Sequence, residues 1–290
     1  MIKSINKANS MGFCTGVRHA IEVVTNTATK LGKVETLGAL VHNKQVIQRL
    51  SRLGVNTIDD ISLIKGDTVV ISAHGVSPVA SEQIRLRGLK TVDTTCAFVN
   101  RAQKAAKNLM ESGFFVVVFG DVDHPEVKGI LGWADGQGMA TLDARGLQKL
   151  SNIPRRLGLL SQTTQIPADF IHFAKDVIDL AFIKDAEIRL IDTICYETRR
   201  RQADTLELAH NSDLVFVIGG RNSANTKRLH EICSAVTATR WIETAYEIEP
   251  VWLEGKERIG ITAGASTDDD TINEVLRRLN DINHSSADVI

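Results

Sequence analysis

Three cysteines repeat in register along the chain and constrain its fold more than any other feature. Residues 93–96 read Asp-Thr-Thr-Cys, and residues 192–195 read Asp-Thr-Ile-Cys. A glycine stands 24 residues after each repeated cysteine, at Gly38, Gly120 and Gly219. Four positions beyond each glycine comes a polar residue: His42, His124 and Ser223. Because a fixed register indicates copies of one structural unit, the sequence predicts three such copies.

Each copy alternates helical and strand patterns. A helical stripe of apolar residues follows Cys96 and ends at Gly113. The apolar run 114–119 is typical of a strand buried on both faces, and Pro125 stands where a second helix would begin. Since this alternation implies parallel sheets with helical crossovers, we predict an α/β fold of three similar small domains with pseudo-threefold symmetry. The predicted domains cover residues 1–95, 96–194 and 195–281, with a flexible tail at 282–290.

The composition is that of a globular protein without a strong charge. Apolar residues make up 43% of the 290 residues, and the net charge is −1. These values exclude disorder throughout the chain and a strongly basic footprint for nucleic acid. No apolar run approaches a membrane span, the N-terminal residues do not read as a signal peptide, and four cysteines are too few for a disulfide scaffold. We expect a cytoplasmic protein with reduced thiols that binds neither nucleic acid nor membrane.

The three repeated cysteines are candidate metal ligands. Each precedes a predicted helix, and a helix N-terminus favours the thiolate form that binds metals. Ligands of parallel sheets gather beyond the carboxyl ends of strands, so the symmetry would bring Cys14, Cys96 and Cys195 to a central metal site. Three thiolates suit either zinc or an iron–sulfur cluster, and spacing does not choose between them. Cys233 lies in a helical apolar stripe without a counterpart and is expected to be an inert core residue.

Polar residues in the loops after strands are candidates for the same centre. His42 and His124 share one register, and His74 follows a strand. Glu126 either complements a helix dipole or donates a proton with a pKa tuned by its surroundings. Four neutral residues are each explained as caps or turn residues, but together they suit a phosphate or diphosphate: Thr163, Ser223, Asn225 and Ser266. No Walker A sequence or GxGxxG follows a strand, so nucleotide binding has no direct support.

Nine short motifs run in order from residue 12 to about residue 280. They are Gly12-Phe13-Cys14-Thr15-Gly16-Val17, Val41-His42-Asn43, Ser72-Ala73-His74-Gly75-Val76-Ser77, Asp93-Thr94-Thr95-Cys96, His124-Pro125-Glu126-Val127, Gln162-Thr163-Thr164, Ile194-Cys195-Tyr196, Asn222-Ser223-Ala224-Asn225 and Thr262-Ala263-Gly264-Ala265-Ser266. In these motifs the chain resembles the LytB (IspH) family of 4-hydroxy-3-methylbut-2-enyl diphosphate reductases. That family catalyses the last step of the non-mevalonate isoprenoid pathway.

The resemblance implies a fold and a chemistry. Cys14, Cys96 and Cys195 would hold a central 4Fe–4S cluster with one open iron. The allylic hydroxyl of the substrate would leave as water, giving isopentenyl and dimethylallyl diphosphates, with electrons from ferredoxin or flavodoxin. Glu126 would deliver protons, and Thr163 would orient both Glu126 and the substrate. The other substrate-binding residues would be His42, His74, His124, Ser223, Asn225 and Ser266.

Two positions depart from the family pattern. Ala97 follows the second cysteine where the family usually has proline, and Ala224 stands where a second serine is common. A lost hydrogen bond to a charged group costs about 1.5–3 kcal/mol, which would weaken diphosphate binding without abolishing it. Two alternatives therefore stay open. One is a paralogous iron–sulfur enzyme acting on another hydroxylated diphosphate; the other is a non-catalytic metal-binding protein, such as an electron carrier or a zinc-stabilised scaffold.

Overall fold

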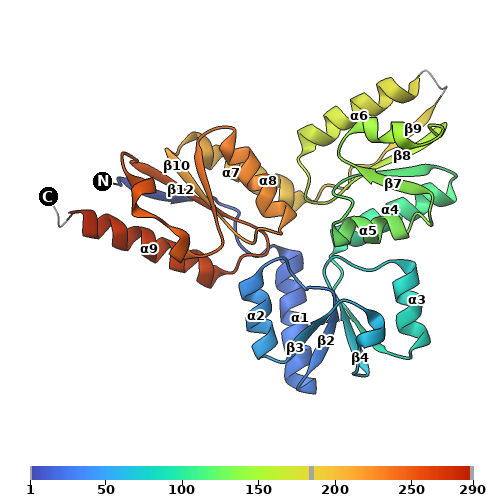
Figure 1. Ribbon diagram of the computed structural model, residues 1–290, viewed down its shortest axis with the longest axis horizontal. Helices are drawn as coiled ribbons and strands as arrows, with labels where there is room; N and C mark the ends of the chain where they lie inside the picture. Colours follow the sequence, from blue (N-terminus) through green and yellow to red (C-terminus); the bar gives the residue numbers. More distant parts are fainter. Residues whose placement is uncertain (1, 183–185, 288–290) are drawn as a thin grey trace. The chain divides into compact units, whose positions relative to one another are not determined.

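Three four-stranded parallel sheets form the framework of the computed structural model, which describes residues 2–182 and 186–287 (Figure 1). The first sheet has the order β3 (Val55–Ile58), β2 (Val34–Leu37), β4 (Thr68–Ile71) and β5 (Lys90–Asp93). The second has the order β7 (Gly138–Thr141), β6 (Phe115–Phe119), β8 (Arg156–Ser161) and β9 (Glu187–Leu190). The third has the order β11 (Ala238–Ile242), β10 (Leu214–Ile218), β12 (Arg258–Ala263) and β1 (Ser4–Lys7). The predicted α/β class with three parallel sheets is confirmed.

Helices connect the parallel strands, as parallel pairing requires. They are α1 (Thr15–Leu31), α2 (Lys44–Arg52), α3 (Pro78–Leu86), α4 (Ala97–Glu111), α5 (Pro125–Gly132), α6 (Pro167–Phe182), α7 (Tyr196–His210), α8 (Ala224–Ser234) and α9 (Asp269–Ala287). Short 3-10 helices lie at Ile61–Leu63, Ala144–Lys149, Ala245–Glu247 and Pro250–Leu253. In the part of the chain that the structure describes, no helix combines the length and apolar character that crossing a membrane requires.

The packing of strand β10 explains why its sequence is a continuous apolar run. Phe216 packs in a core cluster with Val275 of α9, whereas Val215 packs with Leu229 of α8. Figure 1 shows α9 on one face of this sheet and α7 and α8 on the other. Both faces of the strand are therefore buried, and successive side chains enter different cores.

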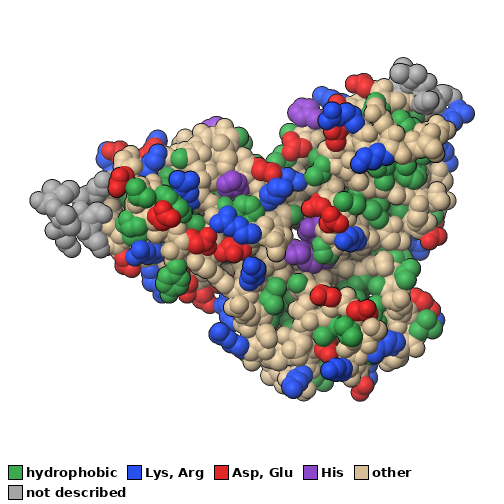
Figure 2. Space-filling view, in the orientation of Figure 1, with side chains coloured by type: hydrophobic (Ala, Val, Ile, Leu, Met, Phe, Trp, Pro, Cys, Tyr) green, Lys and Arg blue, Asp and Glu red, His purple; other side chains and the backbone are tan. Residues whose placement is uncertain are grey.

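The described chain divides into two compact units. Unit 1 contains the described residues of 1–18, 41–49 and 196–290, and unit 2 contains residues 19–40 and the described residues of 50–195. The third sheet belongs to unit 1, and the other two belong to unit 2. On the face shown in Figure 2, acidic and basic side chains are intermixed, as the net charge of −1 leads one to expect.

Two elements lie outside the sequence-based pattern. Strand β1 was not predicted, and it occupies the edge of the third sheet that β5 and β9 occupy in the other two. Helix α9 continues to Ala287, into the segment 282–290 that the sequence suggested as a tail, and residues 288–290 lie outside the described residues. The domain boundaries themselves remain predictions.

Candidate active site

The three repeated cysteines occupy equivalent positions in the structure. Cys14 immediately precedes α1, Cys96 precedes α4 and Cys195 precedes α7. Each cysteine backbone N–H donates to a carbonyl two residues beyond the third strand of a sheet: Cys14 to Ala265 (3.2 Å), Cys96 to Ala73 (3.0 Å) and Cys195 to Thr163 (3.0 Å). The repeated register in the sequence thus corresponds to a repeated contact between a helix start and a strand-end loop.

The environment of the Cys14 thiol differs from that of the Cys233 thiol. All four cysteines are reduced, and the backbone N–H of Val17 donates to Cys14 Sγ at 3.5 Å, as a helix start allows. Cys233 is fully buried in the cluster with Leu229, and burial raises the pKa of its thiol to about 12. The expectation that Cys233 is an inert core residue is confirmed.

Glu126 is a buried carboxyl group in unit 2. It lies in the first turn of α5 and is only 3% exposed. Its Oε1 accepts from the backbone N–H of Thr163 (2.7 Å), and its Oε2 accepts from Thr163 Oγ1 (2.9 Å). Burial raises the pKa of Glu126 to about 7, and the two Thr163 hydrogen bonds oppose this rise. A carboxyl group with such a pKa both holds and releases a proton near neutral pH.

Two histidines lie beside this carboxyl group. His124 is the N-cap of α5, where its Nδ1 accepts from the backbone N–H of Glu126 at 3.2 Å. Accepting at Nδ1 means that this nitrogen carries no proton in the arrangement described, so a ring proton lies on Nε2. The rings of His74 and His124 meet edge to face with centroids 5.6 Å apart.

Unit 2 thus brings six predicted site residues together. Thr163 links Glu126 to Cys195, because its side chain and N–H bind the carboxylate while its carbonyl accepts from the Cys195 N–H. His74 directly follows the residue that accepts from the Cys96 N–H. The six are Cys96, Cys195, His74, His124, Glu126 and Thr163.

Unit 1 carries the remaining five: Cys14, His42, Ser223, Asn225 and Ser266. Asn225 and Ser266 are 5% and 6% exposed. Within the described residues, Asn225 Nδ2 and Ser266 Oγ have no hydrogen-bond partner although both atoms are buried. Native proteins rarely leave buried donors unsatisfied, so these two atoms are suited to a ligand rich in acceptors.

Two other polar residues of unit 1, Ser223 and His42, lie near the loop that follows the carboxyl end of strand β10. Ser223 caps α8, its Oγ accepting from the Thr226 N–H at 3.3 Å, which leaves its own hydroxyl proton to donate. A Cβ on Gly220 would lie 2.3 Å from the carbonyl oxygen of His42, so only glycine lets the His42 segment approach this loop. His42 is partly buried, and burial lowers its pKa, which favours a neutral ring.

Sequence reasoning assigned no role to Gln162, which the structure places beside Thr163. Its Oε1 accepts from the Asp121 N–H (3.2 Å) and from Gln165 Nε2 (3.2 Å). Its own buried Nε2 lacks a partner among the described residues. The available signal was its polar character directly after a buried strand.

Known proteins resemble this chain over nearly its whole length. The family model described as "LytB protein" matches residues 5–280. A protein of Dehalococcoides mccartyi (strain CBDB1) named 4-hydroxy-3-methylbut-2-enyl diphosphate reductase is 56% identical over 272 residues, covering 94% of this chain and 96% of the relative. A protein of the same name from Geobacter sulfurreducens is 41% identical, covering 96% of this chain and 97% of that protein.

Solved structures show the same relationship. One, described as (E)-4-hydroxy-3-methyl-but-2-enyl diphosphate reductase, the terminal enzyme of the non-mevalonate pathway, has a TM-score of 0.70 and 37% identity, and covers 96% of this chain and 99% of that chain. The E-1-hydroxy-2-methyl-but-2-enyl-4-diphosphate reductase of Plasmodium falciparum has a TM-score of 0.87 and 26% identity, covering 97% of this chain and 88% of that chain. The family match and the full-length relatives together establish that this chain belongs to the LytB family.

Proposed function

We propose that the chain is an iron–sulfur oxidoreductase that removes the allylic hydroxyl of 4-hydroxy-3-methylbut-2-enyl diphosphate as water. The products are isopentenyl and dimethylallyl diphosphates, and the reaction consumes two electrons and two protons. The observation that carries the proposal is Glu126, a buried carboxyl group with a pKa of about 7. It is hydrogen-bonded to Thr163, whose carbonyl accepts from the Cys195 N–H. A metal scaffold or an electron carrier has no use for such an acid.

Cys14, Cys96 and Cys195 are proposed to hold one 4Fe–4S cluster. The donor set fits, since three reduced thiols at helix starts favour thiolates, and iron–sulfur clusters are held by thiolates. Three ligands leave one iron open. The cluster, when bound, supplies the electrons that ordinary side chains cannot carry.

Glu126 is proposed to deliver the proton that turns the departing hydroxyl into water. Hydroxide is a poor leaving group, so an acid whose pKa lies near the working pH lowers the barrier. Thr163 is proposed to hold Glu126 through its N–H and hydroxyl, and His124 and His74 to line the substrate pocket with ring N–H donors.

The neutral polar residues of unit 1 are proposed to bind the diphosphate. Ser223, Asn225 and Ser266 offer hydroxyl and amide donors, and the start of α8 adds backbone N–H groups and a favourable dipole. His42 belongs to the same set, with its ring N–H as donor. Ala224 has no hydroxyl, so the set relies on its remaining donors.

Asn225→Ala and Ser266→Ala are expected to raise the KM for the substrate roughly tenfold or more each, with little change in kcat. Each removes a hydrogen bond to a charged group, worth about 1.5–3 kcal/mol. Steady-state kinetics check the split between KM and kcat. Ser212→Ala is the control, because Ser212 is a buried serine of unit 1 that donates to Leu208 O at the opposite end of β10. An unchanged KM in both variants contradicts the assignment.

Ferredoxin or flavodoxin is proposed as the electron donor, in the cytoplasm, where thiols stay reduced. A groove in unit 2, along α4, supports a docking face for such an acidic carrier. Asn100, Arg101, Lys104 and Asn108 line it, and α4 starts directly after Cys96. Arg101 donates to the carbonyl of Asp192, and Lys104 is exposed.

Charge reversal at this groove, in Arg101→Glu/Lys104→Glu, is expected to weaken the protein donor's apparent affinity at least tenfold and to reduce its dependence on ionic strength. Turnover with a small chemical reductant should stay within twofold of the parent. Arg145→Glu/Lys149→Glu, two exposed cations of the same unit, is the charge-matched control. Equal losses with both reductants would assign the effect to the fold and not to docking.

Anaerobic turnover with a low-potential reductant tests the function itself. We expect a coloured, iron-loaded protein that converts the C5 substrate to both products. Preference for a longer hydroxylated diphosphate would favour the paralogue. A colourless, zinc-loaded protein without turnover would favour the scaffold.

A further inference from the structure

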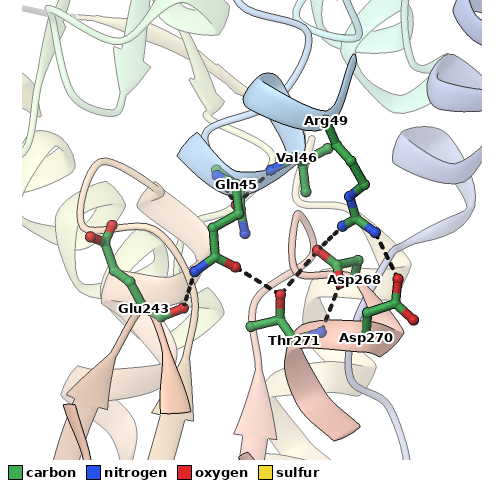
Figure 3. Close-up of polar contacts among 8 residues, drawn as sticks. Gln45, Val46, Arg49, Glu243, Asp268, Asp270 and Thr271 are labelled. Carbon is green, nitrogen blue, oxygen red and sulfur yellow. Dashed lines mark hydrogen bonds and ion pairs between the residues drawn. The ribbon is translucent and has the colours of Figure 1, made fainter. Parts of the chain in front are cut away.

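A polar network in unit 1 connects α2 to the start of α9 (Figure 3). Arg49 on α2 places Nη2 2.5 Å from Asp268 Oδ2 and Nη1 2.7 Å from Asp270 Oδ2. The two carboxylates differ in burial, since the Asp268 side chain is 6% exposed and the Asp270 side chain is 78% exposed. The Arg49 guanidinium therefore forms ion pairs with one buried and one exposed carboxylate.

The buried acid also organises the start of α9. Asp268 Oδ1 accepts from the Thr271 N–H (2.8 Å), and Oδ2 lies 3.1 Å from Thr271 Oγ1. Asp268 stands two residues after Ser266, whose unpartnered hydroxyl we assign to the diphosphate. Whatever fixes Asp268 thus also fixes the loop that carries Ser266.

The same network fixes the other end of α2. Gln45 Nε2 donates to the Glu243 carbonyl (3.1 Å), and Gln45 Oε1 accepts from Thr271 Oγ1 (2.8 Å) (Figure 3). The backbone N–H of Gln45 donates to Asn43 Oδ1 (3.0 Å), so Asn43 caps α2 directly after His42. Gln45 and Arg49 are four residues apart and so lie on one face of the helix.

We propose that Arg49 is a positioning residue that joins the His42 segment and the Ser266 loop into one diphosphate-binding arm. The inference rests on the proposed function, because it assigns both segments to the diphosphate. The ion-pair partners of Arg49 are Asp268 and Asp270, and neither is assigned to the diphosphate or to the cluster. The positive charge of Arg49 compensates the buried carboxylate of Asp268. Without that charge, the carboxylate would move toward solvent and displace the loop that carries Ser266.

Arg49→Met is expected to weaken binding of inorganic diphosphate about tenfold, measured by calorimetry, and to raise the KM for the substrate by a similar factor. We expect kcat and iron content to stay within twofold of the parent, since neither Glu126 nor a cysteine is involved. Arg49→Lys should recover part of the affinity, because an ammonium group keeps the charge but cannot reach both acids as a planar fork does.

Two further variants separate positioning from folding. Arg49→Met/Asp268→Asn removes both partners of the ion pair, so no unpaired buried carboxylate remains and the protein should fold even where the single variant does not. It should still bind diphosphate about tenfold more weakly than the parent. Asp270→Asn removes only the exposed partner of Arg49 and should change the affinity less than twofold. Arg85→Met, which breaks the exposed Arg85–Glu82 pair, should change nothing.

The outcomes distinguish the positioning role of Arg49 from the proposed function of the protein. Parental diphosphate affinity in a folded Arg49→Met or double variant overturns the positioning role and leaves the proposed function standing. Failure of the parent protein to bind diphosphate overturns the proposed function as well. A fall in kcat equal to the rise in KM would show that Arg49 acts on chemistry, which also overturns the proposal.

Discussion

Glu126→Gln is expected to lower turnover by about two to four orders of magnitude, the usual contribution of a positioned acid. The amide keeps an oxygen for the Thr163 N–H but has no acidic proton to give. Iron content and the visible spectrum should stay parental, because Glu126 is not a cluster ligand in this proposal. Anaerobic kinetics with a chemical reductant measure the loss, and near-normal turnover would remove Glu126 from the mechanism.

The same substitution is expected to stabilise the apoprotein at neutral pH. Glu126 has an ordinary pKa of 4.5 in the unfolded chain and a pKa of about 7 when buried, so between these values the folded state holds the additional proton. Stability therefore falls as the pH rises from 4.5 to 7 and stays lower above 7, by on the order of 3 kcal/mol. Gln does not titrate, so the variant does not lose this stability as the pH rises.

Thermal unfolding across pH 4.5–8 checks the sign. The Gln variant should gain several degrees over the parent at pH 8, and the difference should shrink toward pH 4.5. Glu254→Gln, at an exposed position, is the matched control and should show no such trend. A pH-independent difference would mean that Glu126 is already ionised in the folded protein.

Single replacement of Cys14, Cys96 or Cys195 by serine is expected to abolish both the visible absorbance of the reconstituted protein and turnover. A hydroxyl is a far weaker ligand for iron than a thiolate, and each thiolate is a third of the protein ligand set. Iron per chain, measured after anaerobic reconstitution, is the direct readout.

Cys233→Ala provides the control for the three serine variants. Its thiol is buried and its pKa is raised to about 12, so it should keep parental iron content and activity. Full iron content in any one of the three serine variants would exclude that cysteine from the ligand set. Loss in all three, with a parental Cys233→Ala, would establish that the cluster needs all three cysteines.

Much of the fold could be predicted from the sequence because the same pattern of helices and strands is repeated. Strand β6 runs over Phe115–Phe119, where the apolar run 114–119 predicted a strand, and α4 and α5 begin where Cys96 and Pro125 indicated. Strand β1 escaped detection because Ser-Ile-Asn-Lys has a single apolar residue, and its partner β12 lies some 250 positions along the chain. An edge strand that is partly exposed needs few apolar side chains.

The candidate site residues were chosen from equally local signals, and their roles remain predictions. Register singled out the three cysteines, and the predicted helix start singled out Glu126, because both signals can be read locally. The Arg49–Asp268 pair could not be found in this way, since a single arginine and a single aspartate carry no periodicity. Only the fold brings residues 219 positions apart into contact.

The pairing of β1 with β12 also sets an order for biogenesis. During translation the first strand leaves the ribosome unpaired, and its neighbour emerges only when residues 258–263 have been made. The sheets of residues 34–93 and 115–190 can be completed earlier. The segment carrying Cys14, whose N–H binds the Ala265 carbonyl, can therefore be fixed only after residue 265 has been made, and the proposed cluster would be loaded after that point.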